Sequence, residues 1–191
     1  MTDPLTLTVL GTTVLTEGIK FLYSQAGEIL KRWRERRDEV QKAATQLAQT
    51  EPVEVQLPSS VFEGQLFAPQ VHFDKVQQLE EQIRVLRKDL SDYADGIEKV
   101  DVRDKDLLQT IDALRQVLEA VYQQRLTFKG EQRLSSGPVV EGQIDVQQVA
   151  GYAAAVRAKN VTGGEVKAVA RIGRGEPGSQ IIGVDADKIG D

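Results

Sequence analysis

A long three-four spacing of apolar residues is the feature that most constrains the fold of this chain. Between residues 76 and 121, apolar side chains recur at alternating intervals of three and four, which places them along one face of a helix. One residue, Asp104, breaks the row. A face this long has to be buried against another helix, so the pattern predicts a coiled coil or a long helical bundle. The predicted seam consists of Val76, Leu79, Ile83, Leu86, Leu90, Tyr93, Ile97, Val100, Asp104, Leu107, Ile111, Leu114, Leu118 and Val121.

The heptad phase also predicts one continuous main helix, from about residue 71 to about residue 126. Gly96 and the charged run over residues 101–106 leave a helical hairpin open as the alternative. The continuous helix is favoured because a turn has no reason to preserve the phase, whereas a helix does. In that helix Asp104 occupies an a position, where a lone polar residue fixes register or oligomer state; the other interpretation is a local break in the coil.

A second three-four stripe runs from Leu15 to Leu47 and predicts a long N-terminal helix. Asp3 followed by Pro4 is typical of its start, with a capping carboxylate and then proline at the first helical position. Threonines and a glycine lower the helix propensity of the first turns, so a short strand over residues 5–10 is the alternative. This helix is a candidate partner for the main helix, and pairing within one chain or between chains stays open.

Two further segments complete the predicted fold. Three prolines exclude a helix over residues 51–70, and alternating apolar residues there predict a short β-ribbon or an extended connector. Beyond it, glycine-punctuated apolar runs near the C-terminus predict a small all-β module, either an antiparallel meander or a short solenoid with a repeat of about 12 to 15 residues. The predicted class is therefore α+β, with an N-terminal helix over 1–50, the connector over 51–70, the heptad helix over 71–128 and the β module over 129–191.

A basic cluster around the single tryptophan is the sharpest local signal in the sequence. Five cations and one carboxylate lie within seven residues, and they follow a stretch from Leu5 to Thr16 without charge. An apolar helix, an indole and a group of cations in this order are what a membrane-surface anchor requires, although the uncharged stretch is too short to span a bilayer. The other interpretation is that the basic cluster lies on the solvent-exposed side of a helix in a bundle. The residues of this basic cluster are Lys31, Arg32, Trp33, Arg34, Arg36 and Arg37.

Composition and motifs point away from catalysis. The chain has no cysteine and one histidine, and its net charge of −5 gives no general attraction to nucleic acid. Residues 173–178 carry the letters G-x-G-x-x-G, but no helix is predicted after them, so a turn is expected in place of a dinucleotide site. We therefore expect no catalytic residues, no metal, no cofactor and no small-molecule substrate. No secretory signal is evident, so a cytoplasmic location is expected, with peripheral attachment to an anionic membrane as the alternative.

These features predict a non-enzymatic protein that assembles into homo-oligomers through its helices and its β module, in a structural or interaction role. The alternative function is a membrane-acting effector or a peripheral membrane protein that uses the N-terminal helix and the basic cluster. The order of an apolar helix, a helical bundle and a compact β tail resembles the layout of pore-forming helical effectors of microbial immunity. The resemblance covers the order of the segments and no motif, so it implies no roles for individual residues.

Overall fold

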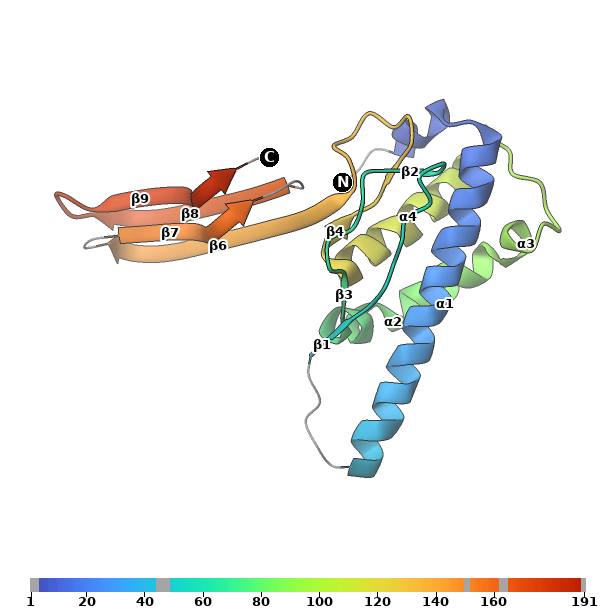
Figure 1. Ribbon diagram of the computed structural model, residues 1–191, viewed down its shortest axis with the longest axis horizontal. Helices are drawn as coiled ribbons and strands as arrows, with labels where there is room; N and C mark the ends of the chain where they lie inside the picture. Colours follow the sequence, from blue (N-terminus) through green and yellow to red (C-terminus); the bar gives the residue numbers. More distant parts are fainter. Residues whose placement is uncertain (1–3, 44–48, 150–151, 162–164, 190–191) are drawn as a thin grey trace. The chain divides into compact units, whose positions relative to one another are not determined.

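The computed structural model describes residues 4–43, 49–149, 152–161 and 165–189, which form both helices and strands (Figure 1). The predicted α+β class is confirmed, and the chain divides into two units, Met1–Ser136 and Gly137–Asp191. The elements of the first unit are η1 (Pro4–Val9), α1 (Thr12–Ala43), β1 (Thr50–Pro52), β2 (Phe62–Glu63), β3 (Gln70–His72), α2 (Phe73–Asp89), α3 (Ser91–Ala94), α4 (Lys105–Tyr122), β4 (Gln124–Arg125) and β5 (Thr127–Phe128). Those of the second are β6 (Gly137–Val149), β7 (Tyr152–Val161), β8 (Glu165–Gly175) and β9 (Gln180–Ile189).

The long N-terminal helix predicted by the second stripe is α1. Its apolar face lies against α2, α3 and α4. The chain before α1 forms a 3-10 helix over Pro4–Val9, so the alternative of a strand over residues 5–10 is wrong. Asp3 and residues 44–48 lie outside the described residues, and with them the predicted capping carboxylate and the last turn of the predicted helix. The α1 side chains buried in the core are Leu15, Ile19, Leu22, Ala26, Ile29 and Leu30.

The single main helix predicted by the heptad phase is wrong, and the chain forms the helical hairpin that was the alternative. α2 ends at Asp89, the single turn α3 follows, and α4 begins only at Lys105. α2 and α4 pack against each other, and both contact α1 (Figure 1). The three helices therefore form a bundle within one chain in place of one long heptad coiled coil.

Gly96 ends the first arm of this hairpin. Its φ of +74° is one that glycine adopts without strain. Its N–H donates to the carbonyl of Tyr93, and the N–H of Ile97 donates to the carbonyl of Asp92, which is the Schellman arrangement at the end of a helix. The chain then leaves the helical path, and Ile97 is 73% exposed, so its predicted place in the buried seam is wrong.

Asp104 begins the second arm of the hairpin as the N-cap of α4. Its carboxylate accepts hydrogen bonds from the N–H groups of Asp106 at 3.0 Å and Leu107 at 3.1 Å. An aspartate is stabilising here because the first N–H groups of a helix have no partner within it. The interpretation of Asp104 as a polar a residue that fixes register is wrong, whereas the other interpretation, a local break in the coil, is correct.

The remaining seam residues form the core of the first unit. Along α2 and its C-cap the a-position side chains are fully buried and the d-position side chains half-buried, whereas the seam residues of α4 are all buried. The heptad therefore identified the buried faces correctly, and α1, α2 and α4 of one chain close them. The buried seam residues are Val76, Ile83, Leu90, Leu107, Ile111, Leu114, Leu118 and Val121, and the half-buried ones are Leu79, Leu86, Tyr93 and Val100.

The connector between α1 and α2 is largely extended, and short strand pairs hold it in place. β1 pairs antiparallel with β3, and β2 pairs antiparallel with β5, which sets Phe62 opposite Phe128. These two rings stack with their centroids 4.9 Å apart, and Phe21 of α1 packs on Phe62 at the same distance. Half-buried apolar residues alternate with exposed polar ones over residues 53–57, so one side of the connector packs on the core.

The β module occupies the second unit, and its four long strands pair in parallel. This is the arrangement of the short solenoid and not that of the antiparallel meander. β6 pairs with β8 at an offset of 26 residues, from Val139 to Glu165, and β7 pairs with β9 at an offset of 28, from Tyr152 to Gln180. Consecutive strands touch but belong to different sheets, so β6 with β7 forms a first rung and β8 with β9 a second. One predicted repeat corresponds to one strand, and two repeats make one rung.

The glycine-rich stretch over residues 173–178 forms the end of β8 and a tight turn. The N–H of Ser179 donates to the carbonyl of Glu176 at 3.0 Å. Pro177 and Gly178 are the central residues, and the φ of +87° at Gly178 is the one that a type II turn requires at this place. The predicted turn is confirmed.

Candidate functional site

The tryptophan of the basic cluster joins α1 to α2. The Trp33 indole N–H donates to the Glu80 carboxylate at 2.7 Å, and the Trp33 ring stacks on Phe73 with the centroids 6.1 Å apart. The guanidinium of Arg36 lies 4.4 Å from the centre of the Phe73 ring, in cation–π geometry. The indole and one of the five cations are therefore held by contacts within the chain.

The other cations of the basic cluster differ in how firmly they are held. Arg32 forms ion pairs with Glu28 on α1 and with Glu51 on β1. Arg37 lies with Nη1 4.0 Å from a Glu80 oxygen, at the outer limit of an ion pair. The part of the cluster that faces solvent is correspondingly small. Its exposed members are Lys31, Arg34 and Arg37.

Glu80 of α2 is the acidic partner of this region. Arg84 donates to its Oε1 through Nη2 at 2.6 Å and through Nε at 3.2 Å, while Trp33 donates to Oε2. These hydrogen bonds, first that of Arg84 and then that of Trp33, lower the pKa of Glu80 below its ordinary value of 4.5. Glu80 is therefore a charged link between α1 and α2 at neutral pH.

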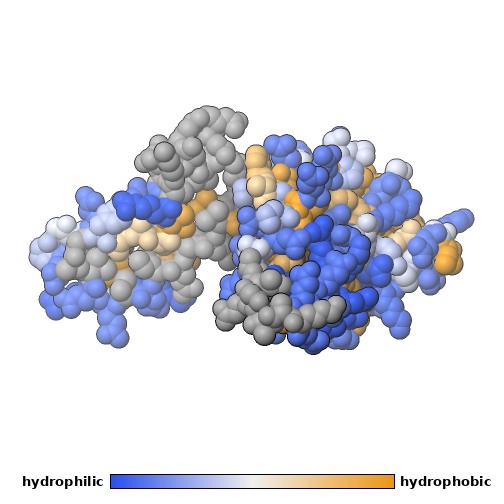
Figure 2. Space-filling view, turned by 60° about the horizontal axis from the view of Figure 1, so that its bottom comes forward, coloured by the Kyte–Doolittle hydropathy of each residue, from blue (hydrophilic) through white to orange (hydrophobic). Residues whose placement is uncertain are grey.

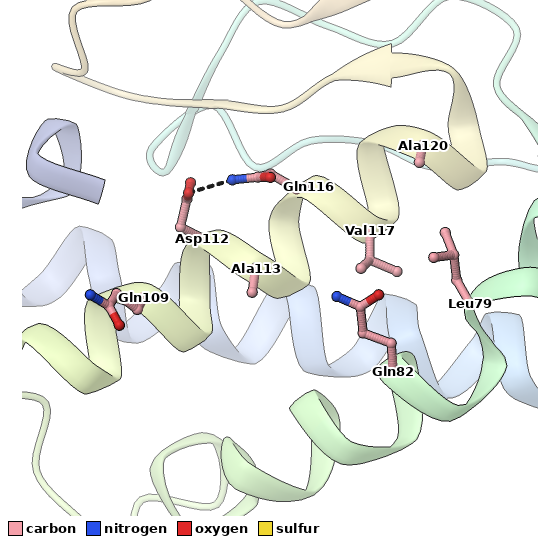
Figure 3. A pocket seen from close by; sticks show the side chains of 8 residues that line it. All are labelled: Leu79, Gln82, Gln109, Asp112, Ala113, Gln116, Val117 and Ala120. Atoms are coloured by element: carbon pink, nitrogen blue, oxygen red, sulfur yellow. Dashed lines mark hydrogen bonds between the residues drawn. The ribbon is translucent and has the colours of Figure 1, made fainter. Parts of the chain in front are cut away.

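A hollow of about 320 Å³ lies between α2 and α4 (Figure 3). Asp112 is the titratable side chain among its lining residues, and its carboxylate already accepts from Gln116 Nε2 at 2.6 Å and pairs with Arg115. General acid–base or nucleophilic catalysis needs a second reactive group beside the first. The hollow does not supply such a pair. Its lining residues are Leu79, Gln82, Gln109, Asp112, Ala113, Gln116, Val117 and Ala120.

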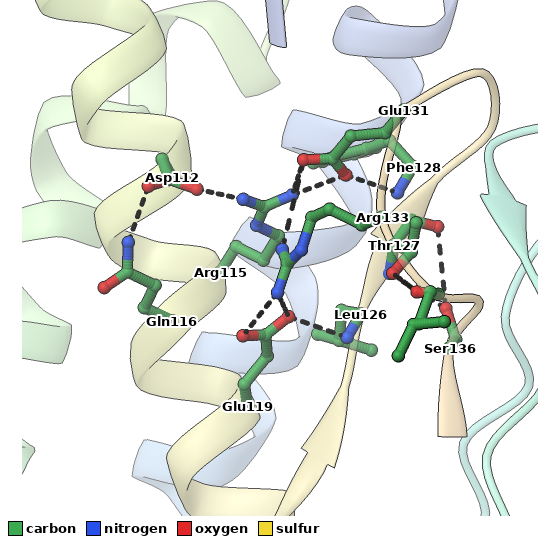
Figure 4. A network of polar contacts seen from close by, with 11 residues as sticks. Asp112, Arg115, Gln116, Glu119, Leu126, Thr127, Phe128, Glu131, Arg133 and Ser136 are labelled. Atoms are coloured by element: carbon green, nitrogen blue, oxygen red, sulfur yellow. Dashed lines mark hydrogen bonds and ion pairs between the residues drawn. The ribbon is translucent and has the colours of Figure 1, made fainter. Parts of the chain in front are cut away.

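A buried network of charged side chains joins α4 to the segment that follows it (Figure 4). Arg115 is fully buried; its Nη1 donates to both carboxylate oxygens of Glu131 at 2.7 Å, and its Nη2 pairs with Asp112. Glu131 also accepts the N–H of Phe128 at 3.1 Å. Charges this deeply buried are tolerated when they are paired and hydrogen-bonded. The network therefore fixes the turn after β5 against the helix.

A second arginine extends this network. Arg133 Nη2 lies 3.2 Å from a Glu119 oxygen, and Glu119 accepts the N–H of Leu126 at 2.8 Å. Each carboxylate of the network thus faces a guanidinium or a backbone N–H, which is typical of a structural role. Sequence reasoning did not identify these residues. The available signal was Asp112 and Arg115, two charges three residues apart beside the apolar seam of α4.

The β module presents open strand edges and exposed apolar side chains. Within the described residues, β8 and β9 each end their sheet, so one edge of each has no strand partner there. Tyr152, Val169 and Ile181 are 44% to 46% exposed, and Figure 2 shows pale and orange side chains between hydrophilic ones on this unit. A long edge of this kind is a template for pairing with another strand.

The charges of the β module alternate from one rung to the next. The register sets Asp145 of β6 opposite Arg171 of β8, and Arg157 of β7 opposite Asp185 of β9. Arg157 Nε donates to Asp185 at 3.2 Å. The Tyr152 hydroxyl donates to the same carboxylate, and this hydrogen bond raises the pKa of Tyr152. Each parallel ladder therefore joins an acidic position to a basic one.

Comparisons with known proteins add no family to this description. No family model, no curated protein and no solved structure matches the chain. Across the described ranges, no helix combines the length and the apolar character that crossing a membrane requires. The function has to be inferred from the contacts within the chain itself.

Proposed function

We propose that this chain is a non-enzymatic interaction protein that assembles into homo-oligomers through its β module. The open edges of β8 and β9, with exposed apolar side chains on the same unit, carry this proposal. A sheet of two strands is marginally stable by itself, and further strands satisfy the backbone groups along its edges. Each copy in this assembly carries one helical unit, Met1–Ser136.

The heptad seam is the other surface that could join copies, and it is occupied within one chain. Leu90 and Leu114 have no exposed surface, whereas Ile97 lies outside the core. Pairing this seam between copies would require α1, α2 and α4 to separate and expose their apolar faces to water, which is unfavourable. Assembly through the β module needs no such rearrangement, so we place the contact between copies on the β module.

The polar groups of the helical unit support a structural role over a catalytic one. The carboxylate at the hollow, Asp112, is bound by Arg115 and Gln116. His72, the single histidine of the chain, lies at the end of β3 as the N-cap of α2. Within the described ranges, no group of three or more histidine, aspartate or glutamate side chains is arranged to hold a metal ion. These contacts use the charged side chains to hold elements together.

Light scattering after size-exclusion chromatography tests the proposal. We expect masses that are multiples of 21.1 kDa and that increase with protein concentration, because association follows mass action. Val169→Asp introduces a charge at a β8 side chain that is 46% exposed, and it should abolish assembly. Val85→Asp, on an α2 side chain that is 48% exposed, is the matched control and should leave assembly unchanged. A mass of one chain at every concentration would contradict the proposal.

A membrane-associated function is the alternative, and the exposed part of the basic cluster supports it. Lys31, Arg34 and Arg37 face solvent, where cations can bind anionic lipid headgroups. The apolar face of α1 and the Trp33 indole, by contrast, are engaged inside the chain. Co-sedimentation with anionic and neutral vesicles separates the two functions. Binding to anionic vesicles that is lost when the three cations are replaced by glutamine would favour the membrane role, and absence of binding would exclude it.

A further inference from the structure

We infer that two copies of this protein join about a two-fold axis, with the second rung of one β module against the second rung of the other. In this contact β8 of each copy lies along β9 of the other copy. The inference rests on the proposed assembly through the β module, and it adds the surface, the partner and the geometry. The partner is a second copy of the same chain.

The second rung is the end of the β module at which both sheets are open. In the part of the chain that the structure describes, β8 and β9 are each the last strand of their sheet and have one edge without a strand partner. The first rung differs, because β6 is an inner strand with neighbours on both of its edges and only β7 has an open edge. Second rungs are therefore the surfaces that can meet with both strands paired, and unpaired edge groups favour such a contact.

Two second rungs can face each other about either of two axes. β8 and β9 belong to different sheets and run in opposite directions, because the tight turn at residues 176–179 joins them. An axis parallel to the strands sets β8 antiparallel to β9 of the other copy. An axis perpendicular to the sheets sets β8 against β8 and β9 against β9, also antiparallel. Backbone hydrogen bonds alone therefore do not distinguish the two arrangements.

The charges of the two strands distinguish them. Between its ends β8 carries three cations and one carboxylate, whereas β9 carries two carboxylates and one cation. Pairing β8 with β9 sets a basic strand against an acidic one in both halves of the contact, while the other axis sets like against like in both. Opposite charges on neighbouring strands are stabilising and like charges are destabilising. The charged residues are Glu165, Lys167, Arg171 and Arg174 of β8, and Asp185, Asp187 and Lys188 of β9.

Charged side chains of both strands reach solvent. Arg171 and Arg174 of β8 are exposed, and the Asp185 side chain of β9 is 33% exposed. Among the described residues, the hydrogen bonds that Asp185 accepts from Tyr152 and Arg157 both end on Oδ2. Its Oδ1 is therefore available as an acceptor for a guanidinium of the other copy, and such charge-assisted hydrogen bonds are strong.

The contact is isologous, so it closes when two chains have joined. Each continuous sheet then has three strands from one copy and two from the other. Sheets of this size are more stable than a sheet of two strands. In light scattering, we expect the mass to rise with concentration from 21.1 kDa to twice that value and to level off there.

The mass at high concentration separates this geometry from its competitors. Masses that continue to rise beyond two chains would overturn the inference and leave the proposed function standing. A mass of one chain at every concentration would overturn both.

Two charge variants test which strands meet. Each reverses the charge of one strand of the second rung and keeps opposite charges at the corresponding ladder position inside the chain. Alone, either variant sets like charges in both halves of the contact and should dimerise at least about tenfold more weakly than the natural protein. The β8 variant carries Asp145→Arg, Arg171→Asp and Arg174→Asp, and the β9 variant carries Arg157→Asp and Asp185→Arg.

A mixture of the two variants should restore the dimer. The acidic β8 of one variant then lies against the basic β9 of the other, and in the second half of the contact a natural β8 lies against a natural β9. Two-colour fluorescence cross-correlation of the labelled full-length proteins measures each combination. A variant that dimerises alone as well as the natural protein would overturn the inference. So would a mixture without dimers when both variants keep the circular dichroism spectrum of the natural protein.

The β8 variant mixed with the natural protein separates the two axes. If β8 lies against β9, one half of the mixed contact is repulsive, and the mixed dimer should be weaker than the natural one. If β8 lies against β8, an acidic strand replaces one of two basic strands, and the mixed dimer should be tighter. A tighter mixed dimer would therefore overturn the inference.

A single substitution repeats the test with less risk to folding. Arg174 lies opposite the uncharged Gln148 of β6, so Arg174→Asp leaves the charge pairs of the ladders intact. It should weaken the natural dimer at least about twofold, and an unchanged dimer would overturn the inference. The matched control reverses an exposed ion pair of α1, in which Lys20 Nζ lies 2.9 Å from Glu17, through Glu17→Lys with Lys20→Glu. This control should dimerise as the natural protein does.

Discussion

At the scale of single residues, Gly18 lets the Phe128 ring lie directly against α1. A Cβ at this position would come 2.3 Å from Cε1 of that buried ring. Alanine is better than glycine by about 1 kcal/mol in an open helix position. At Gly18 the clash with the ring outweighs this advantage of alanine. We expect Gly18→Ala to lower the free energy of unfolding by about 1 to 3 kcal/mol, because the core becomes overpacked. Urea denaturation measures this loss. Gly27→Ala is the control, because its Cβ would meet the guanidinium of Arg87 at 3.1 Å, and an equal loss there would contradict the account.

Removing the charge of Arg115 should destabilise the core strongly, because two buried carboxylates pair with this guanidinium. Arg115→Met would leave Asp112 and Glu131 buried without their common counter-ion. We expect the free energy of unfolding to fall by about 3 to 5 kcal/mol, which is typical when one partner of a buried pair is removed. Chemical denaturation measures the change. Lys20→Met breaks only the exposed pair with Glu17 and should change the same quantity by less than about 1 kcal/mol.

Glu80 makes the stability of the helical unit sensitive to acid. Its pKa in the folded protein is lower than its ordinary value of 4.5, chiefly because Arg84 and then Trp33 hydrogen-bond to the carboxylate. Its contribution is therefore fully present above that ordinary value and is lost as the pH falls through the folded pKa. We expect Glu80→Gln to be less stable than the natural protein at about pH 7 and to lose less stability between about pH 7 and about pH 3. Equal losses on acidification would argue against this role for Glu80.

At the scale of elements, Gly96 lies in the loop between α3 and α4. A continuous helix and a hairpin predict opposite effects of an alanine at this residue. In a continuous helix, Gly96→Ala would stabilise the protein by about 1 kcal/mol. In the hairpin the residue has a φ of +74°, so alanine would be strained and should destabilise by about 1 kcal/mol. Thermal unfolding followed by circular dichroism gives the sign of the change. A rise in the melting temperature would contradict the Schellman end described above.

The helical elements show what the sequence could predict and what it could not. Apolar spacing correctly identified the faces of α1, α2 and α4, because burial of those faces is what the spacing reflects. The break between them was predicted only as the alternative, although its two signals, Gly96 and Asp104, are in the sequence. Glycine costs a helix only about 1 kcal/mol and aspartate caps are equally weak, so local signals did not outweigh a long heptad phase. The outcome depends on α2 and α4 packing on α1, which is a tertiary contact.

For the strands and the candidate contacts, too, local patterns were predicted from the sequence and tertiary partners were not. Alternation and glycine punctuation predicted the β module and its turn at residues 173–178. They left the pairing undecided, because a strand repeat fits a meander as well as a solenoid. The basic cluster was visible as a local run, but its partners Glu80 and Phe73 lie more than thirty positions away in the sequence. Sequence spacing contains no information about such long-range partners. The network around Arg115 was missed for another reason: Asp112 and Arg115 lie three residues apart, but Glu131 reaches Arg115 only through the turn that follows β5.

At the scale of the whole molecule, the single tryptophan reports on the helical unit alone, because Trp33 packs on Phe73 within it. Assembly stabilises the parts that it binds, and this stabilisation grows with concentration. If copies join through the β module, the urea midpoint of Trp33 fluorescence should stay constant over about a hundredfold range of concentration, while the scattering mass rises. A midpoint that rises with concentration would indicate that the helices take part in assembly.

Assembly through the β module also determines how many helical units the protein presents together. Each copy in such an assembly contributes one helical unit, Met1–Ser136. A ligand that binds one helical unit weakly would meet more than one such unit at high effective concentration. The number of copies in the assembly would then determine its valency.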